Sequence, residues 1–495
     1  MPNLTFILFF QICLLLCGAF VLYTVVKAAL FTPKREEHSP LPEETADAQR
    51  IAAHLSGAIQ IATISRPNKE DVDWGQFKAF RSYLQGCYPK LHATLERQDV
   101  SDAALLFYWK GTNPALQPMA LLSHQDVVPV SSGTEGDWVH PPFSGYNDGE
   151  YIWGRGALDM KNHLICVCEA VEDLITEGFQ PERDVYLLFG HDEEVMGAAG
   201  VPGAVALREA LVERGVTELH STLDEGGAMI SIDTSVLKGV LAGVGVAEKG
   251  YVSVAITIPA KGGHSSQPPS HSALGDLAKV ITRLERHQFK AKMTPLMSAL
   301  LDSAGRRLPY YLKLVACNHK LLRPLLLAVM KRIPASACMI RTTTAVTQCS
   351  GSPADNVLPQ KATAVVNFRL MPGTTAEDVL AHIRKVGKNK KMILETQKCN
   401  EASGYAAQEG SAFETIERLA EARGDDVIFA PYLVMGGTDS RYYEPICKHS
   451  FRFSPFQTKM ELITACHGTN ERCPVAELPR AVGFFKAYVR QVSRQ

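Results

Sequence analysis

Four stretches between Leu121 and Gly227 each join an apolar run to acidic residues or histidine at the end of that run. The runs end at His124 and Asp126, at Asp159, at Glu193 and Glu194, and at Asp224. In an open α/β sheet, ligands gather in the crevice beyond the carboxyl ends of the strands. The spacing therefore predicts four strands that bring these side chains to one site.

Each stretch also has an ordinary structural explanation. A buried His124 could simply be capped by Asp126, and Asp159 could cap the helix that follows it. The adjacent glutamates could form a solvated turn, and Asp224 could be a turn residue before two glycines. All four explanations would have to hold together for the region to be purely structural, so the combined pattern favours a metal site.

The chemistry of such a site follows from its donor atoms. Carboxylates with imidazole suit zinc, manganese or cobalt. Of two adjacent glutamates, one can bind metal while the other stays free as the base that an activated water requires. A later stretch, Ala465–Glu471, adds His467 in a glycine-bearing loop. The C-x-x-C and H-E-x-x-H motifs, the P-loop and the G-x-S-x-G motif are absent from the sequence.

The pattern around these motifs predicts two domains. Strands alternate with helices from residue 47 to residue 247, which is typical of a mostly parallel sheet covered by helices. The order then changes to βαββαβ, with strands at 251–258, 342–348, 361–370 and 392–398 and helices at 272–288 and 375–386. We therefore predict an α/β catalytic domain, residues 47–247 and 401–495, interrupted by a ferredoxin-like lid or dimerisation domain at 248–400.

The lid carries an insertion at residues 290–334, which is rich in Leu, Tyr and Met. Apolar helices are usually core, so we favour added core or a dimer surface for this segment. The alternative is a lipid-facing surface or a wall for an acyl chain.

The N-terminus is a separate segment. Residues 4–26 carry no charge and would span a bilayer as a helix. We interpret residues 1–31 as a signal anchor or a cleaved signal peptide, and 32–46 as a stalk. Lys27, Lys34 and Arg35 would favour a cytosolic body by the positive-inside rule, although Glu36 and Glu37 lie beside them. The net charge of −1 gives no reason to expect nucleic acid as a partner.

Eight short runs together resemble one enzyme family. They are SHQDVVPV, WGRGALDMKN, GHDEE, LDEGG, KGGHSSQPP, NFRLMPG, GGTDSR and CHGTNE. Their order over about residues 50–492 is similar to the dinuclear zinc peptidases that include aminoacylase, acetylornithine deacetylase, carboxypeptidase G and carboxypeptidase S. The N-terminal segment, the WxxPPFSG loop and the long insertion most resemble the carboxypeptidase S and N-fatty-acyl-amino-acid synthase/hydrolase group. This group implies a lumenal or extracellular body, membrane-bound or, if the N-terminal segment is cleaved, secreted.

The resemblance implies a role for each matching residue. Two Zn²⁺ ions, with Mn²⁺ or Co²⁺ as alternatives, would share Asp159. One would be completed by His124 and Asp224 and the other by Glu194 and His467, while Asp126 would orient His124 and Glu193 would be the general base. In the lid, His264 would reach the oxyanion, often from a partner subunit, which implies a homodimer. The substrate would be held by Asn356 and Arg369 and by a loop with Gly437, Asp439 and Arg441, whose individual roles stay open.

The expected function is a metal-dependent amidohydrolase that cleaves N-acyl amino acids, or small peptides at the C-terminal residue, with reversible N-fatty-acyl amino acid synthesis as a further option. The alternative is a carboxypeptidase S-like metallocarboxypeptidase of a vacuole or lysosome. An aminopeptidase is disfavoured because Arg369 suggests a substrate with a free carboxylate. A metal-free binding protein is disfavoured because every expected ligand is present.

Overall fold

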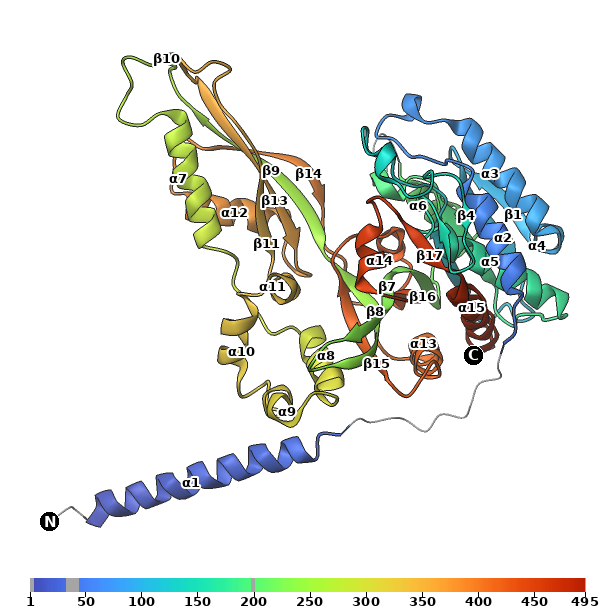
Figure 1. The fold of residues 1–495 in the computed structure, drawn as a ribbon, viewed down its shortest axis with the longest axis horizontal. Coiled ribbons are helices and arrows are strands. Elements are labelled where there is room, and N and C mark those ends of the chain that lie inside the picture. The colour runs from blue at the N-terminus through green and yellow to red at the C-terminus, as the bar shows by residue number, and fades with distance from the viewer. Residues whose placement is uncertain (1–3, 33–43, 197–200, 495) are drawn as a thin grey trace. The chain divides into compact units, whose positions relative to one another are not determined.

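The computed structural model describes residues 4–32, 44–196 and 201–494 (Figure 1). The chain divides into two compact units. We call them the main unit, residues His38–Ile232, Gly239–Glu248 and Ser403–Gln495, and the inserted unit, residues Met1–Glu37, Asp233–Lys238 and Lys249–Ala402.

An eight-stranded sheet organises the main unit. Its strand order is β1-β2-β6-β3-β7-β16-β8-β15. The pairs β6–β3, β3–β7, β7–β16 and β8–β15 are parallel, and the pairs β1–β2, β2–β6 and β16–β8 are antiparallel. The strands are β1 (Glu96–Val100), β2 (Ala104–Trp109), β3 (Met119–His124), β6 (Val185–Gly190), β7 (Ser221–Asp233), β8 (Lys238–Glu248), β15 (Val427–Val434) and β16 (Ser450–Thr458). The predicted mostly parallel α/β sheet is confirmed.

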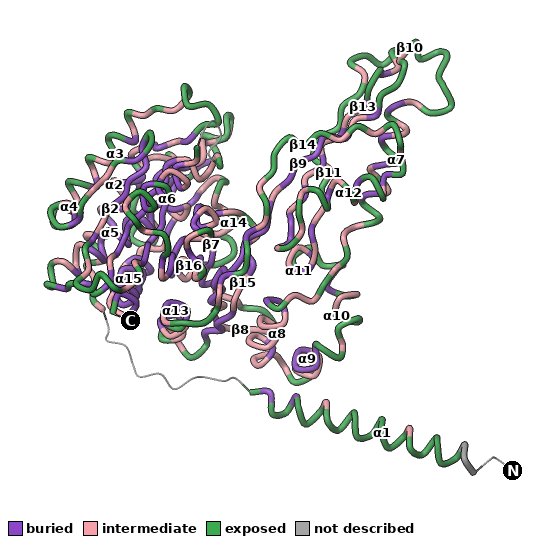
Figure 2. The backbone as a smooth tube through the Cα atoms, turned by 180° about the vertical axis from the view of Figure 1, so that it is seen from behind, coloured by how far each residue is buried: buried purple, intermediate pink, exposed green. Residues whose placement is uncertain are grey.

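Helices pack on both faces of this sheet because its central strands are apolar on both sides. Leu106, Leu122 and Leu188 pack with Leu207 and Leu211 of α6 on one face. Helix α5 contacts β3, α15 contacts β16, and the two helices contact each other. Most residues of the central strands are buried (Figure 2). The helices of the unit are α2 (Ala48–Ile59), α3 (Trp74–Cys87), α4 (Pro89–Thr94), α5 (Lys161–Thr176), α6 (Gly203–Glu213), α13 (Ser411–Glu421), α14 (Met460–Ala465) and α15 (Leu478–Val492), with short 3-10 turns η1 (Lys69–Asp71), η2 (Glu135–Asp137), η3 (Glu193–Val195), η4 (Asp439–Tyr443) and η5 (Val475–Glu477).

Two strands of the main sheet come late in the sequence. β15 pairs with β8, and β16 lies between β7 and β8. In the sequence, residues 249–402 of the inserted unit separate β7 and β8 from β15 and β16. The final residues therefore complete the centre of a sheet that the first two hundred residues begin.

One predicted strand is wrong. The segment that leads to Asp159 was expected in the main sheet, but only Tyr151–Trp153 is a strand, β5, and it belongs to a small antiparallel sheet with β4 (Tyr146–Asn147) and β17 (Arg472–Pro474). Gly154 ends this strand with a φ of +148°, where a Cβ atom would lie 2.4 Å from Ile59. Asp159 therefore reaches the site on a turn just before α5.

The inserted unit is built on a four-stranded antiparallel sheet with the order β11-β13-β9-β14. Its strands are β9 (Gly250–Pro259), β11 (Thr343–Ser350), β13 (Lys361–Leu370) and β14 (Ile393–Asn400), and its helices α7 (Ala273–Arg286) and α12 (Ala376–Gly387) cover one face. The chain order β9, α7, β11, β13, α12, β14 is the predicted βαββαβ pattern. A two-stranded ribbon, β10 (Gly263–His264) with β12 (Val357–Leu358), extends one end.

Between α7 and β11, the insertion folds as four short helices: α8 (Pro295–Gly305), α9 (Tyr310–Ala316), α10 (Arg323–Met330) and α11 (Pro334–Ile340). The N-terminal helix α1 (Leu4–Ala29) contacts α9. Among the described residues, its segment Ile7–Ala29 is the one stretch long and apolar enough to cross a membrane, with a mean hydropathy of 2.3. A signal sequence passes the same test of length and composition.

Candidate metal centre

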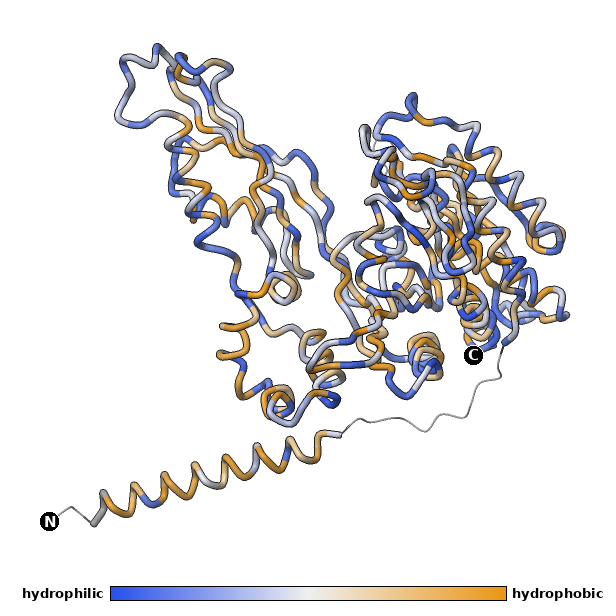
Figure 3. The backbone as a smooth tube through the Cα atoms, viewed as in Figure 1, coloured by the Kyte–Doolittle hydropathy of each residue, from blue (hydrophilic) through white to orange (hydrophobic). Residues whose placement is uncertain are grey.

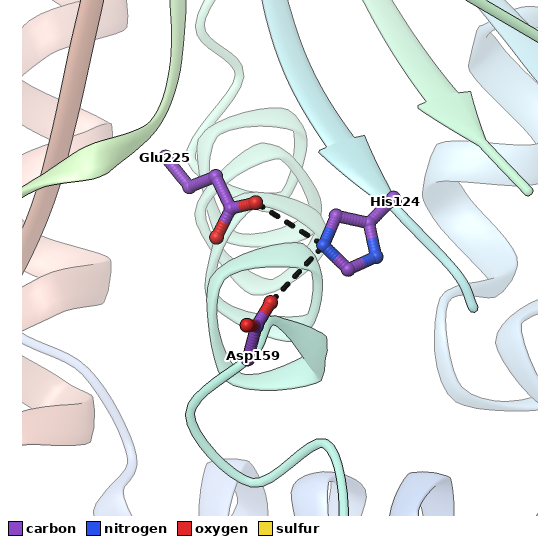
Figure 4. A group of neighbouring side chains, drawn as sticks. All are labelled: His124, Asp159 and Glu225. Carbon is purple, nitrogen blue, oxygen red and sulfur yellow. Dashed lines mark hydrogen bonds and ion pairs between the residues drawn. The ribbon is translucent and has the colours of Figure 1, made fainter. Parts of the chain in front are cut away.

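Three side chains meet at the carboxyl ends of β3 and the neighbouring elements (Figure 4). His124 is the last residue of β3, Asp159 precedes α5, and Glu225 lies within β7. The Nε2 atom of His124 is 3.2 Å from Asp159 Oδ1 and 3.2 Å from Glu225 Oε1. One imidazole nitrogen and two carboxylates thus converge on a single point.

A second group shares Asp159. The Nε2 atom of His467 is 3.0 Å from Asp159 Oδ2 and 3.0 Å from Glu194 Oε2. Asp159 therefore offers Oδ1 to the first group and Oδ2 to the second. His467 adopts a left-handed φ of 63°, which is uncommon for a residue other than glycine and aims the ring from the loop after α14.

The first group differs from the predicted ligand set at one residue. Glu225, not Asp224, joins His124 and Asp159. Asp224 is buried, and its carboxylate accepts hydrogen bonds from the backbone N–H groups of Glu225 and Ser440, both at 2.9 Å. Neighbouring side chains of a strand point to opposite faces, so only one of the two acidic residues can face the site.

The short turn after β6 is held by Asp126. Its carboxylate accepts hydrogen bonds from the backbone N–H groups of Glu193 at 3.3 Å and Glu194 at 3.2 Å. Its backbone oxygen lies 3.0 Å from His124 Nδ1, which leaves Nε2 facing the site. Asp126 therefore orients both glutamates as well as the histidine.

Glu471 is a site residue to which sequence analysis assigned no role. Its Oε1 atom accepts hydrogen bonds from the backbone N–H groups of Leu158 at 2.8 Å and Asp159 at 3.1 Å. Its Oε2 atom accepts one from the Arg155 guanidinium at 2.6 Å, and both side chains are buried. This ion pair fixes the turn that presents Asp159. The signal was present, because Glu471 stands in the same run as His467.

The electrostatics of the two groups fit a cation. Burial, together with the charge of Asp159, raises the pKa of Glu194 to about 7 and that of Glu225 to about 8. Oε1 of Glu194 is buried without a hydrogen-bond partner among the described residues. Such carboxylates stay ionised at neutral pH only if positive charge lies between them. Oxygen and imidazole donors of this kind suit Zn²⁺ and similar ions.

Glu193 lies beside these groups without belonging to either. Its carboxylate is 4.0 Å from His124 Nε2. Burial and the nearby charges of Glu225 and Glu194 raise its pKa well above the usual value. This is the position beside the ligand groups that the general base of a hydrolytic site requires.

The loop with Gly437, Asp439 and Arg441 also lies in the main unit, and its residues are engaged within the protein. Arg441 donates from Nε to Glu248 at 2.9 Å. Asp439 is buried against Gly190, where a Cβ atom would lie 2.3 Å from its carboxylate. A Cβ atom at Gly437 would collide with the Arg441 guanidinium. Asp439 and Arg441 are thus held by contacts within the protein, and the substrate-side role of this loop stays a prediction.

Glu248 is the centre of a buried charged cluster. Besides Arg441, its carboxylate accepts hydrogen bonds from Arg452 Nε at 2.7 Å and from Thr438 Oγ1 at 2.6 Å. Burial alone would raise the pKa of Glu248, but the two guanidinium groups lower it to about 2. The cluster ties the loop at residues 438–441 to the end of β8.

We expect Glu248→Gln to destabilise the main unit by about 3–5 kcal/mol at pH 7, because it removes the carboxylate that both buried guanidinium groups share. The folded pKa of about 2 is below the usual value of about 4.3. The stabilisation is therefore complete above pH ~4.3 and is lost as the pH falls toward 2. Denaturant unfolding at several pH values measures it. A difference between the two proteins that stays constant from pH 7 to pH 3 would contradict this assignment.

Three predicted site residues, the oxyanion residue His264 and the substrate residues Asn356 and Arg369, lie in the inserted unit, and the structure does not bring all of them together. His264 and Asn356 are exposed neighbours at the β10–β12 ribbon, where Ser265 donates a backbone hydrogen bond to Asn356. Arg369 lies near the other end of β13, with its guanidinium 4.8 Å from the Tyr251 ring centroid. The strand from Lys361 to Arg369 is about 27 Å long. One small substrate cannot contact both ends of the same inserted unit.

Comparison with known proteins identifies the class. Residues 120–491 match the model of peptidase family M20/M25/M40, so the chain belongs to this family and the protein is a hydrolase of the metallopeptidase type. It is 31% identical to the probable carboxypeptidase S-like 2 of Dictyostelium discoideum, over 90% of this chain and 85% of the relative. It is 30% identical to the human N-fatty-acyl-amino acid synthase/hydrolase PM20D1, over 91% of this chain and 90% of the relative.

Solved structures share the fold. The M20 family metallo-carboxypeptidase Sso-CP2 of Sulfolobus solfataricus superposes with a TM-score of 0.62 at 17% identity, covering 90% of this chain and 99% of that one. Human carnosine dipeptidase 1 superposes with a TM-score of 0.59 at 14% identity, covering 90% and 96%.

Proposed function

We propose that this protein hydrolyses the amide bond of N-acyl amino acids, including those with long acyl chains, with the aid of two Zn²⁺ ions. The observation that carries the proposal is the use of both Asp159 oxygens by two neighbouring ligand groups with Glu193 beside them. Relatives named as N-fatty-acyl-amino acid synthase/hydrolases support the substrate class.

His124, Asp159 and Glu225 would hold one ion, and Asp159, Glu194 and His467 the other. When bound, a pair of divalent ions supplies Lewis acidity that polarises a carbonyl group and lowers the pKa of water. Glu193 takes the proton of the attacking water. As it does so, the water oxygen adds to the carbonyl carbon and the new C–O bond forms. Glu193 then returns the proton to the nitrogen of the leaving amino acid, and the C–N bond breaks.

The remaining roles concern the inserted unit. Arg369 is proposed to bind the free carboxylate of the substrate, because a guanidinium matches a carboxylate in a bidentate manner. His264 and Asn356, at the far end of the same sheet, are proposed to serve the site of a second copy. This assignment makes the protein a homodimer that associates through the inserted unit.

The proposed location follows from α1. Its segment Ile7–Ala29 meets the length and hydropathy of a membrane span. We place it in a bilayer as a signal anchor, with the body of the protein lumenal or extracellular.

A series of N-acyl amino acids of increasing chain length tests the substrate class. Burial of apolar atoms contributes about 0.8 kcal/mol per methylene, so kcat/KM should rise about fourfold for each added methylene until the acyl pocket is full. Blocked dipeptides with the same C-terminal residue are the matched control, and the Glu193→Gln protein gives the background rate. A flat series from acetyl to oleoyl with rapid dipeptide cleavage would exclude the fatty-acyl substrate and favour a carboxypeptidase S-like peptidase.

A further inference from the structure

The last turn of α1 is attached to the insertion of the inserted unit. Tyr310 donates a hydrogen bond from its hydroxyl to the backbone oxygen of Val25 at 3.0 Å. Arg306 donates one to the backbone oxygen of Thr32 at 2.8 Å, and its guanidinium lies 4.3 Å from the Phe31 ring centroid. Ala28 and Phe31 are buried against Ala316 and Cys317, at the C-terminal end of α9. These contacts fix α9 at the C-terminal end of the apolar helix.

This attachment fixes the depth of α9 relative to a bilayer. The apolar segment ends at Ala29, and the residues that touch α9 lie within its last turn and just beyond it. If α1 crosses a bilayer, this end lies where the hydrocarbon meets the headgroups. Helix α9 must then lie at the same level. Tyr310 and Tyr311 begin α9 and are exposed, and tyrosine is a residue type that favours this interface.

An exposed apolar stripe follows α9 in the sequence. Leu321, Leu325, Val329 and Ile333 recur at intervals of four residues over α10, and each is about half exposed. Residues on the other side of α10, including Leu326, Leu327 and Met330, pack with Met297 and Ile340 instead. Our preferred interpretation of the insertion as core therefore holds for only one side of α10. Figure 3 shows hydrophobic residues along α1, α9 and α10.

The same segment is strongly basic. Between residues 303 and 354 the sequence contains no Asp or Glu. Seven basic residues lie among the exposed apolar ones: Arg306, Arg307, Lys313, Lys320, Arg323, Lys331 and Arg332. Exposed apolar residues interspersed with Lys and Arg are the pattern of segments that lie in the interface of a membrane.

We propose that α9 and the stripe on α10 rest on the bilayer that α1 crosses, with Leu325 and its stripe neighbours inserted among the lipids. The proposal depends on the membrane location proposed above for α1. It commits to lipid as the occupant because the surface continues from the end of a membrane-spanning helix and carries Lys and Arg side chains that can bind the phosphate groups of lipid headgroups. A surface for a second copy of the chain would not require this charge or this position.

Lipid-embedded quenching tests the proposal on the full chain. The protein is placed in nanodiscs of phosphatidylcholine and phosphatidylserine, with a fluorescent amino acid encoded at Leu325. The matched control carries the probe at Val357, which is also about half exposed in the inserted unit but lies on the β10–β12 ribbon. Brominated lipids should reduce the emission at position 325 by about twofold or more and leave position 357 nearly unchanged. The substitution pair Lys331→Glu and Arg332→Glu should weaken the quenching at position 325 when phosphatidylserine is present.

The outcomes separate the proposals. A chain that fails to enter nanodiscs overturns the membrane location of α1 and this inference with it. A chain that enters nanodiscs with equal quenching at both positions overturns this inference alone. Energy transfer between position-325 probes of two copies, without lipid quenching, would overturn it in favour of a dimer surface. None of these measurements depends on catalytic activity, so an error in the proposed substrate would not change their outcome.

Discussion

Glu193→Gln is expected to lower kcat by about two to four orders of magnitude while the protein keeps its metal. The Glu193 carboxylate lies 4.0 Å from His124 Nε2. In the part of the chain that the structure describes, Glu193 belongs to neither of the two ligand groups. Glutamine has nearly the same shape and cannot accept a proton, and loss of a general base costs rates of this size. Steady-state kinetics on the best N-acyl amino acid, together with metal analysis of the same preparation, measures both effects.

Glu194→Gln is the matched control for this experiment, because it removes the neighbouring carboxylate that does contact His467. We expect it to lower metal content as well as activity. If Glu193→Gln also releases metal, Glu193 is a ligand. If it retains nearly normal turnover, another group is the base.

Glu225→Ala is expected to remove about one of the two metal equivalents and to lower activity by at least ~10–100-fold, the loss that even the supporting partners of metal ligands produce. The reason is the 3.2 Å approach of Glu225 to His124 in the group that shares Asp159. Metal analysis after dialysis at pH 7 gives the stoichiometry directly.

Asp224→Asn tests the same assignment from the other side. Asp224 accepts hydrogen bonds from two backbone N–H groups, so its loss should affect stability more than metal content. Full metal content in Glu225→Ala with a reduced content in Asp224→Asn would show that Asp224, not Glu225, is the ligand.

The sequence located most of the candidate metal centre because its residues stand at the ends of recognisable elements. His124 ends an apolar strand, Glu194 follows another, and both meet Asp159 or His467 in the structure. The choice between Asp224 and Glu225 could not be made in this way. Both are acidic and adjacent, and only the orientation of β7 within the sheet decides which one faces the site. Glu471 stands in the same run as His467, but the sequence does not show that its carboxylate is buried and accepts hydrogen bonds from the backbone N–H groups of Leu158 and Asp159.

The sequence predicts the helices and strands whose residue periodicity is strong, but it does not show which elements pack or pair with one another. The segment Tyr151–Asp159 looked like a strand of the main sheet, yet its first residues pair with Arg472–Pro474 instead. Alternation of residue types indicates that a segment is a strand, but it does not show with which strand that segment pairs. The insertion was located by its length and composition, but which side of α10 is buried depends on contacts with Met297 and Ile340 that the sequence does not reveal.

The late arrival of β16 has a consequence for how the protein folds during synthesis. β16 lies between β7 and β8 in the sheet but leaves the ribosome only after the whole inserted unit. The inserted sheet is continuous in the chain, so it is free to fold first, while the part of β7 from Thr222 to Ile230 still lacks its partner β16. We therefore expect nascent chains stalled near residue 440 to show a protease-resistant inserted unit and a protease-sensitive main unit. Chaperones would then act on the main unit during the time needed to synthesise the last sixty or so residues.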